Sequence, residues 1–107
     1  MASNRDFVEF VADQCAKAGE ITFRQMFGEY GIYCNGKIFG LVCDNRLYVK
    51  VTPAGAALLS HPVLLPPYEG AKDYYYIEDV DDADRLSLLV CETCKLLPAP
   101  KNKQKKG

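Results

Sequence analysis

The chain has 107 residues, of which 49% are hydrophobic and 25% are charged, as is typical of one soluble globular domain. Its formal net charge is −1, but four lysines lie in the last seven residues, and the rest of the chain carries −5 once those four charges are removed. Because an acidic body disfavours a phosphate-binding surface, we expect no sequence-specific binding of nucleic acid.

The sequence contains no apolar segment that is long enough to span a bilayer, so we expect no membrane association. The first residues, MASNRDF, are polar and do not resemble a secretory signal. We therefore expect a cytoplasmic protein whose five cysteines are reduced. An odd number of cysteines agrees with this expectation, since a secreted disulfide framework would leave one thiol unpaired.

Residues 4–18 are predicted to form an amphipathic helix. Ser3 and Asp6 approximate a capping box at its start, and Gly19 supplies a C-terminal stop. The apolar residues between them recur at helical spacing: Phe7, Val8, Phe10, Val11, Cys15 and Ala18.

From Glu20 the apolar pattern changes to a period of two, which predicts strands. Four are expected, at 21–27, 29–34, 37–43 and 46–51. Asn35-Gly36 is the strongest short hairpin signal, because both turn positions require a positive φ. Asp44-Asn45 is a weaker turn of the same kind.

These turns set an expected register, in which Ile32 lies opposite Phe39 and Leu41 opposite Tyr48. One face of the sheet then gathers an aliphatic set: Tyr33, Ile38, Val42, Leu47, Val49 and Val51. The other face gathers a second apolar set rimmed by charge: Tyr30, Ile32, Phe39, Leu41, Tyr48, Arg46 and Lys50. Because the second face needs a cover, we expect a homodimer with Tyr30, Phe39 and Tyr48 near its interface.

The C-terminal half is predicted to add two helices and one strand. Thr52-Pro53 opens a short helix, a proline-rich loop covers 61–70, and the aromatic run 74–77 is a fifth strand. Asp79, Asp81 and Asp82 precede a final helix. Its buried stripe is expected to contain Leu86, Leu89, Val90, Thr93 and Leu97. Residues 1–100 would form the domain, and the lysine-rich tail 101–107 would be disordered.

Cys91 and Cys94 form a CxxC motif, which suggests redox or metal chemistry. A redox pair needs its first cysteine at a helix N-terminus, whereas this pair falls well inside the predicted last helix. A zinc site would need two further ligands, and Cys34, Cys43 or His61 would have to converge on the pair. We therefore interpret the two thiols as small apolar side chains, and we expect no disulfide, metal or cofactor.

The glycine- and aromatic-rich stretch 24–40, RQMFGEYGIYCNGKIFG, contains no nucleophile or acid–base pair of a common catalytic motif, so we expect no enzyme. Its glycines have structural uses: Gly28 and Gly31 at a bulge or bend, Gly36 in the turn, and Gly40 at a close approach between strands. Arg24 and Lys50 are edge charges with apolar stems, or they form a binding patch beside Tyr30 and Tyr48.

The residues of this stretch also carry a resemblance to a known family. They are Arg24, Met26, Phe27, Gly28, Tyr30, Gly31, Ile32 and Tyr33, followed by Asn35, Gly36, Phe39 and Gly40, and then by the strand Leu47-Tyr48-Val49-Lys50-Val51. In these motifs the chain closely resembles the N-terminal domain of the TfoX/Sxy family, regulators of natural competence in bacteria. The resemblance covers nearly the whole chain.

The resemblance implies an α+β fold: a single antiparallel sheet of about five strands, flanked by an N-terminal helix, a short middle helix and a C-terminal helix in two layers. It also implies a non-enzymatic role in transcriptional regulation through protein partners, here as a stand-alone domain. The alternative is a small-ligand- or anion-binding domain, enzymatic or not, built on Arg24, Tyr30, Tyr48 and Lys50.

Overall fold

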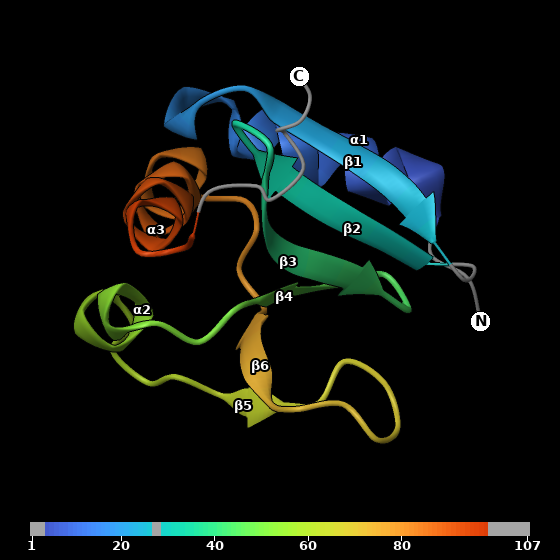
Figure 1. The fold of residues 1–107 in the computed structure, drawn as a ribbon. Helices are drawn as coiled ribbons and strands as arrows, with labels where there is room; N and C mark the ends of the chain where they lie inside the picture. Colours follow the sequence, from blue (N-terminus) through green and yellow to red (C-terminus); the bar gives the residue numbers. More distant parts are fainter. Residues whose placement is uncertain (1–3, 27–28, 99–107) are drawn as a thin grey trace.

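A computed structural model of the chain describes residues 4–26 and 29–98 and shows an α+β fold (Figure 1). In chain order its elements are α1 (Arg5–Gln14), a 3₁₀ turn η1 (Ala16–Ala18), β1 (Ile21–Met26), β2 (Glu29–Cys34), β3 (Lys37–Cys43), β4 (Arg46–Val49), α2 (Pro53–Leu58), β5 (Leu64–Leu65), β6 (Tyr74–Ile77) and α3 (Ala83–Lys95). The strands that it describes form one antiparallel sheet in the order β1-β2-β3-β4-β6-β5. The expected fold class is confirmed. The expected tail, 101–107, lies outside the described residues.

The first helix begins one residue later than its sequence pattern suggested. Its cap is Asn4, whose Oδ1 accepts a hydrogen bond of 2.7 Å from the backbone N–H of Asp6; Ser3, the cap expected from the sequence, lies outside the described residues. The helix buries Val8, Val11 and Cys15, but Phe10 is 40% exposed. The expectation that Phe10 belongs to the buried stripe was therefore wrong.

Both hairpin turns form as their sequences predicted. Asn35 and Gly36 have φ values of 52° and 85°, and Asp44 and Asn45 have values of 55° and 57°. These positive values are those of the two-residue turns whose twist matches the flanking strands. The strands that they join are confirmed to within two residues at each end that the structure describes.

A β-bulge in β3 changes the register that was expected beyond the first turn. Tyr33 lies opposite Ile38, but Ile32 lies opposite Gly40 instead of Phe39, so that Phe39 is the extra residue. Gly40 accommodates this arrangement because a Cβ at its position would collide with the backbone carbonyl oxygen of Tyr48 on β4.

The bulge reverses the assignment of side chains to faces along half of β3. Ile32 and Phe39 lie on the same face as Val42 and are fully buried, whereas Tyr33 and Ile38 lie on the other face, with Leu41 and Tyr48. The predicted pairs Leu41–Tyr48 and Val42–Leu47 are confirmed, but the two predicted faces were wrong for the residues on the other side of the bulge. The error has a simple physical cause: one inserted residue moves every following side chain to the opposite side of the sheet.

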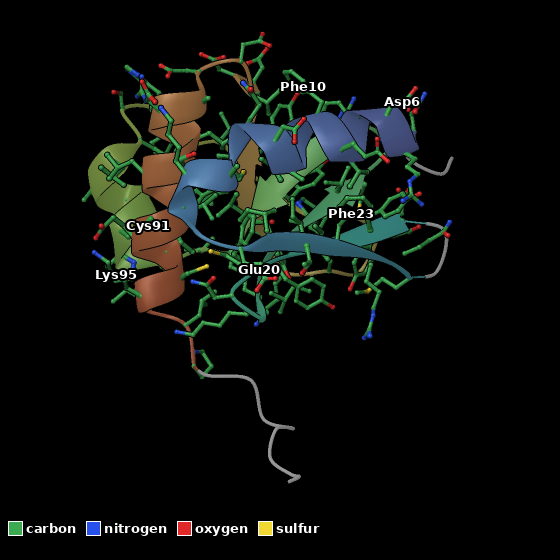
Figure 2. All side chains as sticks on the ribbon, turned by 90° about the horizontal axis from the view of Figure 1, so that it is seen from above. Asp6, Phe10, Glu20, Phe23, Cys91 and Lys95 are labelled. Atoms are coloured by element: carbon green, nitrogen blue, oxygen red, sulfur yellow. The ribbon has the colours of Figure 1, made fainter. Side chains whose placement is uncertain are left out.

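The main core lies between the helices and one face of the sheet, which we call the covered face. Helices α1 and α3 lie on this side, while α2 packs beside α3 (Figures 1 and 2). Gly55 of α2 allows close packing against the ring of Tyr75. The buried residues of the core cluster are Val8, Val11, Cys15, Tyr30, Ile32, Cys34, Phe39, Val42, Leu47, Val49, Tyr75, Ile77, Leu86, Leu89, Val90 and Cys94.

The C-terminal half contains a strand that the sequence pattern did not indicate. Leu64–Leu65, inside the expected proline-rich loop, pairs with Tyr74–Tyr75 as the short strand β5 at the edge of the sheet. The hydroxyl of Thr52 makes no capping hydrogen bond to α2, against expectation, whereas Asp82 caps α3 through a 3.2 Å hydrogen bond from the backbone N–H of Arg85. None of the helices described is both long enough and apolar enough to cross a membrane.

Candidate functional site

The face of the sheet turned away from α1 and α3, which we call the open face, carries three of the four residues predicted as a binding patch. One row of paired residues crosses the sheet: Arg24, Gly31, Leu41, Tyr48 and Tyr76. Directly paired residues of antiparallel strands share a face, so Arg24 on β1 and Tyr48 on β4 lie on the same side, with two strands between them. Lys50 follows on this side, because its backbone N–H continues the β3–β4 ladder with a 2.8 Å hydrogen bond to Phe39.

Tyr30, the fourth residue of the predicted patch, lies on the covered face. It pairs with Val42 and is 7% exposed. Its ring meets that of Phe23 edge to face, with centroids 5.9 Å apart, a favourable arrangement of two aromatic rings. The structure thus gives Tyr30 a packing role in the core, separate from the other three residues.

The centre of the open face is a small apolar cluster above Gly31. A Cβ at Gly31 would lie 2.6 Å from Cε of Met26, 3.1 Å from Cδ1 of Ile38 and 3.5 Å from Cε1 of Tyr33. The missing side chain is therefore the space into which these three side chains pack. Gly31 was expected to serve a bulge or bend, but the bulge lies at Phe39 and Gly40 instead. Phe27 and Gly28 of the same motif lie outside the described residues.

Tyr48 forms the most enclosed part of the open face. Its ring is 3% exposed and lies beside that of Tyr76, with centroids 5.8 Å apart. The guanidinium of Arg46 is hydrogen-bonded to Tyr48, which raises the pKa of Arg46. Tyr48 is buried yet lies outside the core cluster under the helices, so it belongs to this second surface. No local pattern indicated the neighbour Tyr76, because the pairing of β6 with β4 joins segments far apart in the chain.

The open face therefore combines an apolar centre with cations at its edges. Arg24 and Arg46 are exposed and Lys50 is half-buried. Tyrosine hydroxyls and guanidinium groups can donate hydrogen bonds to carboxylates or backbone carbonyls of a partner. Such a composition is typical of the residues that carry binding energy at protein interfaces.

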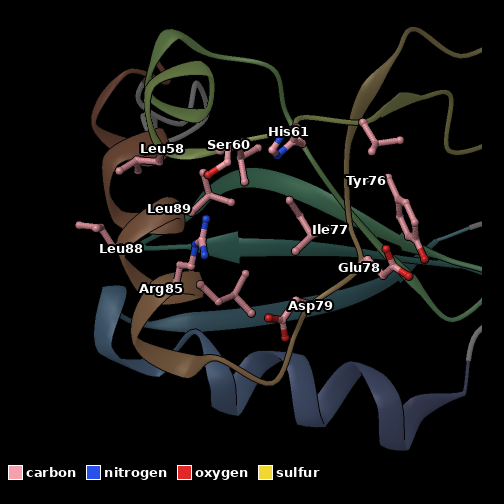
Figure 3. A pocket seen from close by; sticks show the side chains of 13 residues that line it. Leu58, Ser60, His61, Tyr76, Ile77, Glu78, Asp79, Arg85, Leu88 and Leu89 are labelled. Atoms are coloured by element: carbon pink, nitrogen blue, oxygen red, sulfur yellow. The ribbon is translucent and has the colours of Figure 1, made fainter.

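A separate groove lies between α2, the end of β6 and α3, with a volume of about 520 Å³ (Figure 3). Its apolar lining includes Leu58, Leu86 and Leu89. Polar side chains stand around it (Figure 3): Ser60, His61, Glu78, Asp79 and Arg85. None of the residues predicted as a binding patch lines this groove. Its walls come from segments far apart in the sequence, so no local motif could have indicated it.

The CxxC cysteines lie in the second half of α3, as expected. Cys94 is buried and Cys91 is partly exposed. Burial, reinforced by the neighbouring Cys34 thiol, raises the pKa of Cys94 to about 12, so that its thiolate is scarce at neutral pH. Within residues 4–26 and 29–98, no group of three or more His, Cys, Asp or Glu side chains is arranged to hold a metal ion.

Comparison with known proteins finds one matching family model and one curated relative. A family model described as the TfoX N-terminal domain matches residues 13–95. A protein of Spirochaeta aurantia, described as an uncharacterized 12.7 kDa protein in the trpE 5' region, is 39% identical over 107 residues. The match covers 99% of this chain and 93% of that protein.

Proposed function

Because the chain belongs to the TfoX N-terminal domain family, we propose that it is a non-enzymatic, cytoplasmic domain that regulates transcription by binding protein partners. The observation that carries this proposal is the open face. Its side chains form a second packed surface, separate from the core and without α1 or α3 over it. We assign partner binding to this face and place Arg24 and Lys50 in the contact, with Tyr48, which is 3% exposed, packed beneath it.

The chemistry of the open face favours a protein partner with acidic groups. Tyrosine and arginine dominate the energetics of many protein interfaces, and the cations at the edges would accelerate association with a negatively charged surface. Within residues 4–26 and 29–98, neither Arg24 nor Lys50 belongs to a salt bridge. Five of the six strands described contribute to this surface through a single row of paired residues.

The experiment compares a face variant with a matched control. Arg24→Glu combined with Lys50→Glu reverses two charges on the open face, and Arg85→Glu reverses one charge of α3 that lines the groove and lies outside the open face. Cross-linking and affinity purification from the native host should recover a partner with the wild type and the control but not with the face variant. Direct binding of the purified partner and transcript profiles of complemented deletion strains complete the test. The proposal fails if the face variant retains both partner and transcript profile.

We also propose that a second copy of the chain can occupy the open face. The expected homodimer residues Tyr30 and Phe39 lie in the protomer's own core, so a dimer would instead use the partly exposed Tyr33, Ile38 and Leu41. An isologous contact would bury the same residues from each copy. Sedimentation equilibrium of the purified chain distinguishes a dimer from a single species near 11.9 kDa, and the latter would exclude it.

A further inference from the structure

Strand β1 forms one edge of the sheet, and among the residues described it has a neighbouring strand on one side only. Figure 2 looks down onto this edge, and α1 lies beside β1 rather than over it. All six residues of β1 pair with β2 in one continuous register. Natural proteins commonly protect such an edge with lysines or bulges, but β1 contains neither. This edge is therefore open to a further strand.

The hydrogen bonds to β2 show which backbone groups of β1 point outward. The N–H of Asn35 donates a 2.8 Å hydrogen bond to the carbonyl oxygen of Glu20, so the ladder with β2 uses every second residue from Glu20 onward. The N–H and C=O groups of the residues in between point to the free edge: Ile21, Phe23 and Gln25. In the described part of the chain no hydrogen bond reaches these groups, so an added strand would satisfy them.

The side chains along this edge carry opposite charges at equal distances from one residue. Glu20, Thr22 and Arg24 alternate along the strand, so they lie together on the open face. All three are exposed. Among the residues that the structure describes, neither Glu20 nor Arg24 takes part in a salt bridge. A two-fold rotation about Thr22 would therefore bring the acidic residue of one copy opposite the basic residue of the other.

We propose that β1 pairs with β1 of a second copy of this chain, as antiparallel strands related by a two-fold axis at Thr22. In this register Thr22 lies opposite its own copy and Glu20 lies opposite Arg24. Ile21 lies opposite Phe23, and their outward backbone groups meet in pairs that each exchange two N–H···O bonds. Opposite charges, two threonines, and an aromatic beside a β-branched side chain are all favourable cross-strand pairs.

The neighbouring registers lack this match. An axis at Phe23 places Arg24 opposite Thr22, and an axis at Ile21 places Arg24 opposite Ala18. An axis at Arg24 brings two guanidinium groups together, which is unfavourable. Of these four registers, only the axis at Thr22 gives Arg24 an acidic partner. Charge complementarity thus selects both the occupant of the edge, a second copy, and the register.

This contact is separate from the residues of the open-face dimer, Tyr33, Ile38 and Leu41. Two-fold pairing of antiparallel strands keeps corresponding faces on the same side. The two six-stranded sheets would therefore become one, and the open faces of both copies would form one surface. Because the purified chain alone tests this contact, the result does not depend on whether a protein partner binds.

Cysteine cross-linking of the purified chain tests the contact and its register. Thr22→Cys places two thiols directly opposite each other, with Cα atoms about 4.5 Å apart, which a disulfide can span. Arg24→Cys is the matched control, an exposed position on the same face of the same strand, because its copy would lie roughly 13 Å further along the edge. With oxidised glutathione we expect a linked dimer of Thr22→Cys, located by peptide mass spectrometry, and none of Arg24→Cys or of the wild type.

A mixed sample gives a second test of the same register. Glu20→Cys and Arg24→Cys should not link to themselves, but an equimolar mixture of the two should form a link between positions 20 and 24. No link in Thr22→Cys, equal linking of Thr22→Cys and Arg24→Cys, or no link in the mixture would overturn the proposal.

Sedimentation equilibrium measures the strength of the contact. The wild type should form a dimer of twice 11.9 kDa. Glu20→Arg and Arg24→Glu each lose two ion pairs per dimer, so each should raise the dissociation constant by roughly 2- to 30-fold. The double variant Glu20→Arg/Arg24→Glu restores both pairs with their signs exchanged and should return close to the wild type. A wild type that stays a single species near 11.9 kDa, or a double variant as weak as the single ones, would contradict the proposed pairing.

Discussion

Two glycines of the same motif should respond in opposite ways to the addition of one methyl group. At Gly40 a Cβ would collide with the backbone carbonyl oxygen of Tyr48, and would also lie 3.3 Å from the carbonyl carbon. Main-chain atoms of a paired strand cannot move without disturbing the ladder. At Gly31 the nearest atoms are the ends of the Met26 and Ile38 side chains, which can change rotamer.

The expected magnitudes follow from this difference. Overpacking commonly costs about 1–3 kcal/mol, and the rigid carbonyl places Gly40→Ala at the upper end, at about 3 kcal/mol. Gly31→Ala should cost less than about 1 kcal/mol, because side-chain adjustment is offset by the roughly 0.5–1 kcal/mol that alanine gains over glycine within a strand. For a domain of this size, about 3 kcal/mol corresponds to a fall in melting temperature of roughly 10–20 °C.

Urea unfolding followed by circular dichroism measures both effects in one assay. If the free energy of unfolding falls with urea concentration at the same slope in the wild type and both variants, a shift of the urea midpoint reports a change in stability. The reasoning from the bulge is refuted if Gly40→Ala unfolds within about 0.5 kcal/mol of the wild type, a spread usual for surface substitutions, or if Gly31→Ala is the more damaging change.

Three further predictions concern the core, a surface ion pair and the thiols. Phe39→Ala should lower the free energy of unfolding by about 3–5 kcal/mol, whereas Phe10→Ala on the exposed side of α1 should change it little; similar losses in urea unfolding would contradict the assigned faces. Lys17 lowers the pKa of Asp84 through a 2.6 Å hydrogen bond. The small contribution of this pair to the free energy of unfolding should be present above the ordinary pKa of 3.8 and lost as the pH falls below it. Unfolding of the wild type and of Lys17→Met over a series of pH values, with and without salt, checks this. A thiol reagent without added reductant should find five thiols in the unfolded chain and react slowly with native Cys43, whose pKa burial raises to about 11; fewer than five thiols would show a bridge or a bound metal.

The local elements of this fold could be predicted from the sequence because their signals are local. Asn35-Gly36 and Asp44-Asn45 specify their turns through the φ values that they tolerate, and the stripe from Leu86 to Thr93 specifies a helix through its spacing. In each case the residues that decide the structure are neighbours in the chain, so that reading them requires no knowledge of the rest of the molecule.

What could not be predicted depends on contacts between distant segments. The bulge at Phe39 depends on the packing of Phe39 in the core and on the close fit of Gly40 against β4. No pattern of neighbouring residues predicts such an unpaired position. The pairing of Leu64–Leu65 with β6 likewise requires the whole topology. Within the predicted binding patch, Arg24, Tyr48 and Lys50 occupy strand positions whose side chains lie on the open face. Tyr30 is the neighbour of Gly31 on β2, so its side chain lies on the opposite, covered face.

The short edge strand β5 has a consequence for how this protein behaves when it is concentrated. Its Leu64 and Leu65, and Val63 just before it, are exposed apolar residues, and an exposed apolar edge is a template on which a neighbouring chain can extend the sheet. Prolines at 62, 66 and 67 bracket these residues, and proline has no N–H to offer to an added strand. A second chain would therefore find only a short segment between prolines to pair with, and this limits the extension of the sheet beyond β5 into a fibre.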